Sequence, residues 1–153
     1  MRRLPLLAIL ALALLLASPV RATQVAQKDP SQAIKGFFQA VDAQDYAQAW
    51  RLLSSQSRNT LAQLIARDEK LEPQEVLRLF ESDDPSIRAG FWESFRTNSG
   101  ASVLAAGTFE TLEVGGGRAR VQMKGREQVA FLAFLEEGSW RFGLVETFPF
   151  EQK

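Results

Sequence analysis

The spacing of apolar residues changes near residue 100, and this change constrains the fold more than any other feature of the sequence. Before it, apolar side chains recur every three or four residues, as at Ile34, Phe37, Phe38 and Val41. After it, residues 118–124 alternate between apolar and polar. The first spacing is typical of one helix face and the second of a half-buried strand. The sequence therefore predicts an α+β domain, with N-terminal helices packed on an antiparallel sheet.

Capping residues and prolines mark five predicted helix starts: Asp29, Asp45, Ser57, Pro73 and Asp84. Aspartate and serine side chains accept hydrogen bonds from the first free N–H groups of a helix, and proline fits its first turn. In the last helix Phe91 and Phe95 share a face, so Trp92 is predicted to be exposed or to cover a pocket mouth. We interpret the helices of residues 73–95 as a lid or partner-binding appendage, the alternative being a layer packed on the sheet.

Residues 98–100 are predicted to end the helical half, and four strands are predicted after them. The first carries a bulge near Gly107, and a tight turn at residues 115–117 follows it. The third is apolar on both faces, which suits a central strand or one covered by a partner. The predicted strands are residues 103–114, 118–124, 128–135 and 140–147.

The N-terminus has the three-part layout of a secretory leader. Arg2 and Arg3 are followed by an apolar stretch of roughly 14 residues, shorter than the span of about 20 that a membrane helix needs. Small residues at Val20 and Ala22 suit signal peptidase. The sequence therefore predicts a signal peptide over residues 1–22 and a single domain over residues 23–153. The expected location is the periplasm or the extracellular medium, with no membrane anchor after cleavage.

The chain contains no cysteine and no histidine. Zinc sites of the usual kind and Ser-His-Asp or Cys-His catalysis are therefore excluded. The full chain has 18 basic and 18 acidic residues. The leader holds three of the arginines and no acid, so the remaining domain is mildly acidic. Nucleic-acid binding relies on neutralising phosphates, so we expect no nucleic-acid partner. We expect no cofactor and no metal.

Two short stretches resemble the nuclear-transport-factor-two-like superfamily, which includes ketosteroid isomerases and is also described as cystatin-like. Residues 41–46 and 49–54 are similar to its first helix, acidic turn and second helix, and residues 137–142 look like its final hairpin. The resemblance implies a cone-shaped roll, in which a curved antiparallel sheet wraps the first helices around an apolar pocket. It also implies many functions, because fold alone does not select one.

The resemblance implies an isomerase activity, but the catalytic residues that this activity requires are missing from the sequence. The position that matches the family's catalytic tyrosine is Phe37, which has no hydroxyl, and residues 54–63 contain no carboxylate for a general base. The dehydratase branch depends on histidine, which is absent. We therefore expect the fold of such an enzyme without its catalytic activity.

Six residues are candidates for a ligand-binding pocket, and core packing is the alternative role for each of them: Phe37, Phe38, Trp50, Met123, Phe131 and Trp140. Glu110 and Glu113 could form an acid–base pair only if a bulge brought them to one face, because positions i and i+3 of a strand point to opposite faces. A basic stripe follows them and suits either an anionic partner or a solvated strand face: Arg118, Arg120, Lys124 and Arg126.

Three hypotheses of function follow. The preferred one is an exported, non-enzymatic binding or scaffold domain whose apolar pocket holds a small apolar ligand. The first alternative is a carboxylate-dependent enzyme of the isomerase or dehydratase type, acting on a small apolar substrate. The second is an envelope protein–protein interaction domain, which would use the strand of residues 128–135 to form a homodimer or to bind an envelope protein.

Overall fold

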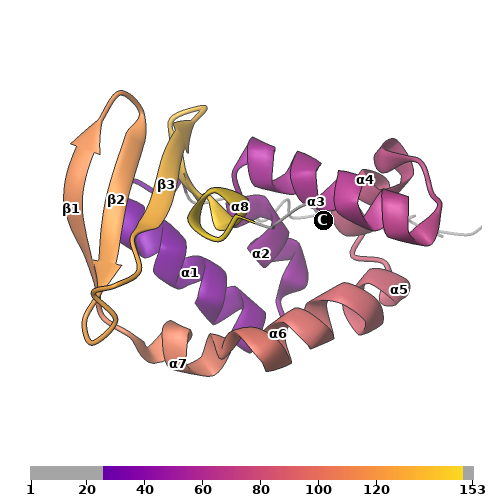
Figure 1. The fold of residues 1–153 in the computed structure, drawn as a ribbon, viewed down its shortest axis with the longest axis horizontal. Helices are drawn as coiled ribbons and strands as arrows, with labels where there is room; N and C mark the ends of the chain where they lie inside the picture. Colours follow the sequence, from indigo (N-terminus) through magenta and orange to yellow (C-terminus); the bar gives the residue numbers. More distant parts are fainter. Residues whose placement is uncertain (1–25, 150–153) are drawn as a thin grey trace, which may run out of the picture.

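The computed structural model describes residues 26–149. It has the predicted α+β architecture, with N-terminal helices packed on an antiparallel sheet (Figure 1). The predicted leader lies outside the described residues.

The helices of the first part begin where the sequence predicts in most cases. They are α1 (Pro30–Asp42), α2 (Tyr46–Leu52), α3 (Ser55–Glu69) and α4 (Pro73–Glu81). The carboxylates of Asp29 and Asp45 accept hydrogen bonds from N–H groups in the first turns of α1 and α2, so both predicted caps are confirmed. The predicted cap of the third helix is wrong. Ser54 caps α3 instead, and Ser57 donates its N–H to the Ser54 hydroxyl at 3.0 Å.

The next helical segment runs without interruption from residue 85 to residue 99. It comprises α5 (Pro85–Ile87), a π-helical turn η1 (Arg88–Trp92) and α6 (Glu93–Ser99). The Asp84 carboxylate accepts from the N–H of Ser86, which confirms the predicted start. We call the part formed by η1 and α6 the η1–α6 helix.

Trp92 is only 1% exposed, so the prediction that it is exposed or covers a pocket mouth is wrong. The helix is contacted on two sides. Trp92 packs against Tyr46 and Phe80. Phe91 and Phe95 are half-buried and pack against the edge of Trp92 while bordering other elements. A π turn adds a residue to the helical turn and changes the direction of the side chains after it, so α-helical spacing alone does not give the orientation here.

The predicted end of the helical half at residues 98–100 is also wrong. Gly100 has φ +67°, which ends α6, but a further helix α7 (Ala101–Ala106) follows at once. Alanine favours helix, and Ala101 and Leu104 of α7 are buried, with α7 lying against α1. Residues 103–106 of the predicted strand 103–114 are therefore helical, and the strand itself, β1 (Phe109–Gly115), begins only at Phe109.

The sheet is an antiparallel meander in the order β1-β2-β3-β4, with β2 (Arg118–Met123), β3 (Phe131–Glu136) and β4 (Ser139–Phe142). Helix α1 contacts all four strands. Val121, Phe131 and Ala133 are buried on the sheet face toward it. The bulge lies between Thr111 and Glu113 of β1 rather than near Gly107.

The last predicted strand, residues 140–147, is wrong beyond Phe142. The chain turns at Gly143 into a short helix, α8 (Leu144–Thr147). A Cβ at Gly143 would come within 2.5 Å of the Phe134 ring, so the close approach of the two requires glycine. The N–H of Gly143 donates to the carbonyl of Leu132, and the Thr147 hydroxyl accepts from the N–H of Leu132. Helix α8 thereby covers part of the second apolar face of β3.

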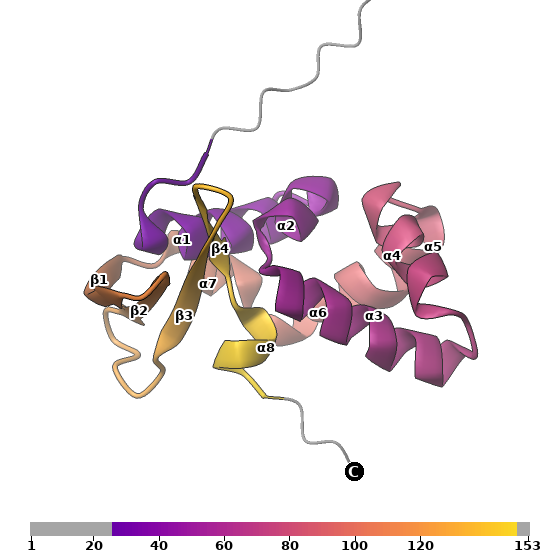
Figure 2. The same cartoon turned by 90° about the horizontal axis from the view of Figure 1, so that it is seen from above.

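The elements form two ends joined by α1 and the η1–α6 helix (Figures 1 and 2). The sheet and α7 lie at one end. Helices α3, α4 and α5 lie at the other, and α2 stands between them. Helix α3 and the η1–α6 helix run along opposite sides of the molecule in Figure 1.

Candidate ligand-binding cavity

An apolar cavity of about 490 Å³ opens between the η1–α6 helix and the elements around the sheet. Small-molecule sites in proteins typically occupy about 300–1,000 Å³, so the cavity is large enough for a ligand. Its walls come from α1, the η1–α6 helix, α7, the β2–β3 loop, β3, and α8 with the residues after it. The lining residues are Phe38, Gly90, Phe91, Ser94, Phe95, Asn98, Ser99, Leu104, Arg126, Val129, Phe131, Leu144 and Phe148.

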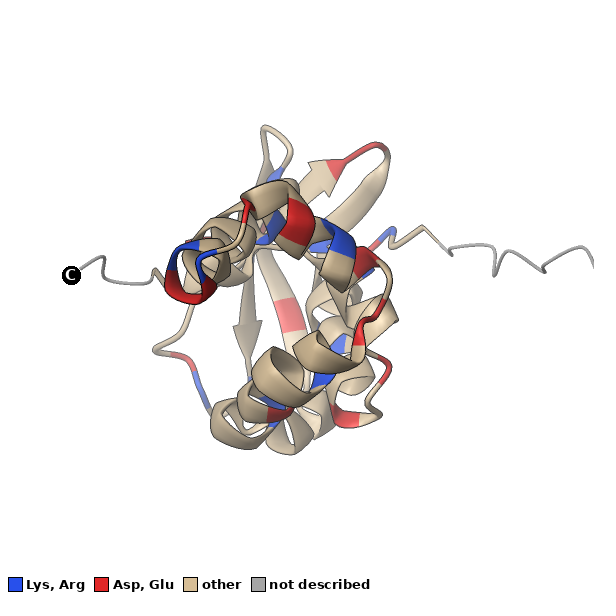
Figure 3. Cartoon of the chain, turned by 90° about the vertical axis from the view of Figure 1, so that its right-hand side faces the viewer, with Lys and Arg blue, Asp and Glu red and all other residues tan. Residues whose placement is uncertain are grey.

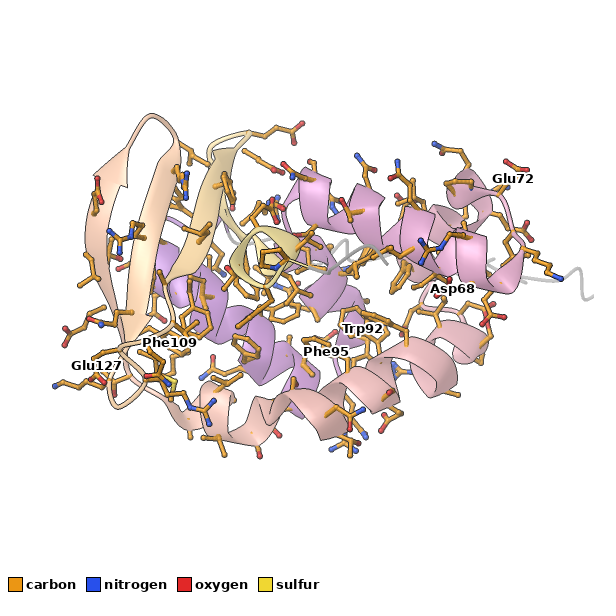
Figure 4. The ribbon with its side chains drawn as sticks, in the orientation of Figure 1. Asp68, Glu72, Trp92, Phe95, Phe109 and Glu127 are labelled. Atoms are coloured by element: carbon orange, nitrogen blue, oxygen red, sulfur yellow. The ribbon has the colours of Figure 1, made fainter. Side chains whose placement is uncertain are left out.

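One wall is a single face of the η1–α6 helix. Ser94, Phe95 and Asn98 recur at α-helical spacing and share one face of α6, and Phe91 of η1 lines the cavity beside them. Among the described residues of α6, none is fully buried. The face therefore borders a hollow, although Phe95 also meets the edge of the Phe37 ring at 5.9 Å. Figure 4 shows Phe95 projecting from the helix toward the interior.

The opposite wall consists of Phe38, Phe131 and Leu144, each at most 3% exposed. The rings of Phe38 and Phe131 meet edge to face at 6.3 Å. Leu144 belongs to α8, which is held against α3 by Glu146. The Glu146 carboxylate accepts hydrogen bonds from the hydroxyls of Ser54 at 2.7 Å and Ser57 at 2.6 Å. This wall is thus fixed by packing and by buried hydrogen bonds.

The polar groups of the cavity come from α6 and from the β2–β3 loop. Arg126 is the only ionisable residue among the described residues that line it. The Asn98 amide donates to the Ser94 hydroxyl at 3.2 Å. The hydroxyl oxygen of Ser99 is buried and has no hydrogen-bond partner in the described part of the chain. The same holds for Trp50 Nε1 and Arg58 Nε, which border a separate pocket of about 200 Å³.

A second hollow of about 490 Å³ adjoins the cavity along the η1–α6 helix. The two share Gly90 and Phe91. The second hollow also has apolar walls, formed by Ile65, Leu71, Leu79 and Ile87, but Asp68 and Glu69 stand at its rim. Figure 4 places Asp68 at the α3–α4 end of the molecule, and Figure 3 shows charges of both signs interspersed there.

The structure brings two of the six predicted pocket residues into the cavity wall, namely Phe38 and Phe131. The other four lie elsewhere. Phe37 is fully buried in the core, and Trp140 is 8% exposed in β4. Trp50 stacks on Phe80 at a centroid distance of 4.0 Å. Met123 packs against Gly107, where a Cβ would lie 2.3 Å from the methionine methyl carbon.

Sequence reasoning placed none of the residues of the η1–α6 helix in a pocket wall, and Phe91 and Phe95 were predicted only to share a helix face. Ser94, Asn98 and Ser99 carry no motif, and Gly90 has no feature that marks it. The sequence could have indicated Ser94 and Asn98 only through their helical spacing relative to Phe95. That spacing becomes informative only once the helix is known to border a hollow.

A polar cluster that the sequence analysis did not predict holds the η1–α6 helix on its side away from the cavity. The Tyr46 hydroxyl donates to the Glu93 carboxylate, which also accepts from Arg96 at 2.9 Å and from the Gln44 amide at 3.2 Å. Burial, and then the bond to Glu93, raises the pKa of Tyr46. The bond from Tyr46, and then that from Arg96, lowers the pKa of Glu93. Arg88 lies over the Tyr46 ring at 4.9 Å. Tyr46 does not line the cavity.

The bulge in β1 brings Glu110 and Glu113 to the same face of the sheet, opposite Gln122 and Arg120. Each carboxylate then faces a basic side chain. Lys124 lies 3.8 Å from Glu110, and Arg120 lies 3.6 Å from Glu113. All four side chains are more than half exposed. The basic stripe is therefore largely a solvated face paired with acids, and Arg126 differs from its other members because it lines the cavity.

In the range 26–149, no cluster of three or more Asp or Glu side chains could hold a metal ion. None of the helices in that range is long and apolar enough to cross a membrane. Comparison with models of known protein families, with curated proteins and with solved structures found no match.

Proposed function

We propose that the protein is an exported binding domain that holds a small apolar molecule in the cavity of Phe38, Phe95 and Phe131. The observation that carries the proposal is a hollow of about 490 Å³ with largely aromatic and aliphatic walls. Apolar walls with a few convergent polar groups are typical of small-molecule sites. Protein interiors otherwise pack densely, because every void loses dispersion contacts.

Binding rather than catalysis is the function that these wall residues favour. General acid–base chemistry needs a group that takes up or releases a proton at the substrate. In the cavity wall, as far as it is described, Arg126 is the ionisable residue, and arginine stays protonated. The leader-like N-terminus supports an exported setting in the periplasm or the medium. The helices-then-meander order is compatible with the proposed nuclear-transport-factor-two-like, cystatin-like roll.

A pair of substitutions at Gly90 tests the proposal. Gly90 lines both hollows, and a Cβ there would meet no heavy atom within 4 Å. Gly90→Trp should fill the space, whereas Gly90→Ala adds one methyl group and favours the helix. The measurement is binding of the neutral fluorescent probe N-phenyl-1-naphthylamine to the purified protein.

We expect the probe to bind the natural protein and Gly90→Ala alike, and to bind Gly90→Trp at least tenfold more weakly, a change of about 1.4 kcal/mol. Thermal unfolding of both variants shows that each is folded. If the natural protein does not bind the probe, or if Gly90→Trp binds it equally well, the cavity is not the binding site.

A further inference from the structure

The cavity has an uneven distribution of charge, which limits the chemical classes of ligand that it can bind. Its one described ionisable residue is Arg126, at the β2–β3 loop. None of the ion pairs between described residues includes this arginine. The neighbouring Glu127 carboxylate accepts from the N–H of Gly125 at 2.8 Å, and is engaged with its own turn. Arg126 is exposed, so the cavity presents at its solvent-facing edge a positive charge that can attract an anion.

Hydrogen-bonding groups of α6 line the same cavity. The buried Ser99 hydroxyl has no partner in the described part of the chain, and a buried polar group without a partner is destabilising. The Ser94 hydroxyl and the Asn98 amide line the cavity as well. The Ser99 hydroxyl oxygen has almost no exposed surface, so the exposed Ser94 and Asn98 are the groups of α6 that can reach the head group of a ligand.

The adjoining hollow has the opposite character at its rim. Asp68 and Glu69 stand there, and a ligand anion would be repelled by them. Phe91 belongs to the walls of both hollows. An elongated apolar chain that starts at Arg126 and passes Phe38 and Phe131 would meet Phe91 before it could reach the second hollow.

We propose, building on the proposed function, that the ligand is a long-chain carboxylate, such as a fatty acid. Its carboxylate binds Arg126, with Asn98 as a further hydrogen-bond partner, and its acyl chain runs along the aromatic walls toward Phe91. Guanidinium groups match the planar, two-oxygen geometry of a carboxylate. Phe91 limits the length of chain that the cavity accepts.

The head group is tested with two ligands of equal chain length, dodecanoate and dodecanol. The variants are Arg126→Gln and, as a matched control, Arg118→Gln, which removes an exposed arginine of β2 that does not line the cavity. We expect Arg126→Gln to weaken dodecanoate binding about tenfold or more, because hydrogen bonds to charged groups contribute that much. Dodecanol binding should be unchanged, and Arg118→Gln should behave as the natural protein.

The chain path is tested with octanoate, decanoate, dodecanoate and hexadecanoate. Each buried methylene should tighten binding about fourfold until the chain reaches Phe91, and longer chains should gain nothing more. Phe91→Ala should move this plateau to longer chains, because it joins the two hollows. Phe91→Leu keeps a bulky side chain and should leave the plateau nearly unchanged.

The outcomes separate this inference from the proposed function. If dodecanol and dodecanoate bind equally well and Arg126→Gln affects neither, the cavity binds apolar molecules but the assignment of an anionic head group is wrong. If neither ligand binds the natural protein, the proposed function itself fails. If Phe91→Ala proves unfolded, the head-group comparison and the plateau in the natural protein still decide the proposal, and affinity independent of chain length overturns the chain path.

Discussion

The aromatic residues of the η1–α6 helix have different roles on its two sides. On one side Trp92 stacks on Tyr46 at 5.3 Å and meets the edge of Phe80 at 5.9 Å, and Phe80 in turn contacts Trp50. We call this set the aromatic seam. On the other side Phe95 faces a hollow together with residues of the sheet end. One helix thus contributes both to a filled region and to the wall of an open one, and its Phe91 and Phe95 contact both.

The difference between the regions lies in what each side chain contacts rather than in residue type. In the seam Phe80 and Trp92 are each 1% exposed, and the Tyr46 hydroxyl is bonded to Glu93. In the cavity Phe95 remains partly exposed, and the Ser99 hydroxyl lacks a partner among the described residues. Filled packing stabilises the fold, whereas a hollow sacrifices dispersion contacts. The seam therefore stabilises the fold, and the cavity leaves space for the proposed ligand.

The largest expected effect is a difference in the free energy of unfolding between a substitution in the seam and one in the cavity wall. Phe80→Ala removes a buried ring of the seam and should lower the free energy of unfolding by about 4 kcal/mol. Phe95→Ala removes a ring that already borders open space, so it should cost about 1.5 kcal/mol. Denaturant unfolding measures both values. Equal losses would show that the cavity side is as tightly packed as the seam.

A smaller effect is expected at the hydroxyl of the seam. Tyr46→Phe keeps the ring stacked on Trp92 but removes the hydrogen bond to Glu93, which still has Arg96 as a partner. We expect a loss of about 1 kcal/mol in the free energy of unfolding, and no change in binding of a cavity ligand. A change in ligand affinity would mean that the two sides of the helix are coupled.

The same pair gives a pH dependence whose sign follows from the two pKa shifts. The lowered pKa of Glu93 contributes stability above its unfolded value of about 4.3, and this is lost as the pH falls through the folded pKa. The raised pKa of Tyr46 contributes stability below about pH 10, and this is lost as the pH rises through the folded pKa. The stability difference between the natural protein and Tyr46→Phe should therefore be constant near neutrality and shrink at both extremes. Urea unfolding across the pH range measures it, and a difference that grew below pH 4 would contradict the pairing.

The smallest expected effect belongs to the cavity. Ser99→Ala removes a buried hydroxyl without a described partner and adds helix propensity, so the unliganded protein should gain about 0.5 kcal/mol. Binding of dodecanoate should be unchanged, because the hydroxyl oxygen is not exposed to the cavity. A loss of stability would show that the hydroxyl already has a structural role.

Local patterns predicted much of the fold because the forces involved are local. The caps at Asp29, Asp45 and Asp84 depend on hydrogen bonds within one helical turn, and all three are confirmed. The alternation of residues 118–123 gives β2 for a similar reason. The predictions that were wrong concern segments whose structure depends on contacts between residues far apart in the sequence. Helix α7 packs on α1, and the chain after Phe142 bends into α8, where Glu146 reaches the hydroxyls of Ser54 and Ser57.

The sequence by itself determined the α+β class and the order of helices before strands, and the absence of histidine and cysteine excluded whole classes of chemistry. Only the tertiary structure decided which apolar residues pack and which border a cavity. An apolar pattern shows that a side chain leaves water, because burial is a property of one face of one element. Whether another side chain fills the space opposite depends on residues that lie far along the chain, as Phe38, Phe95 and Phe131 do here.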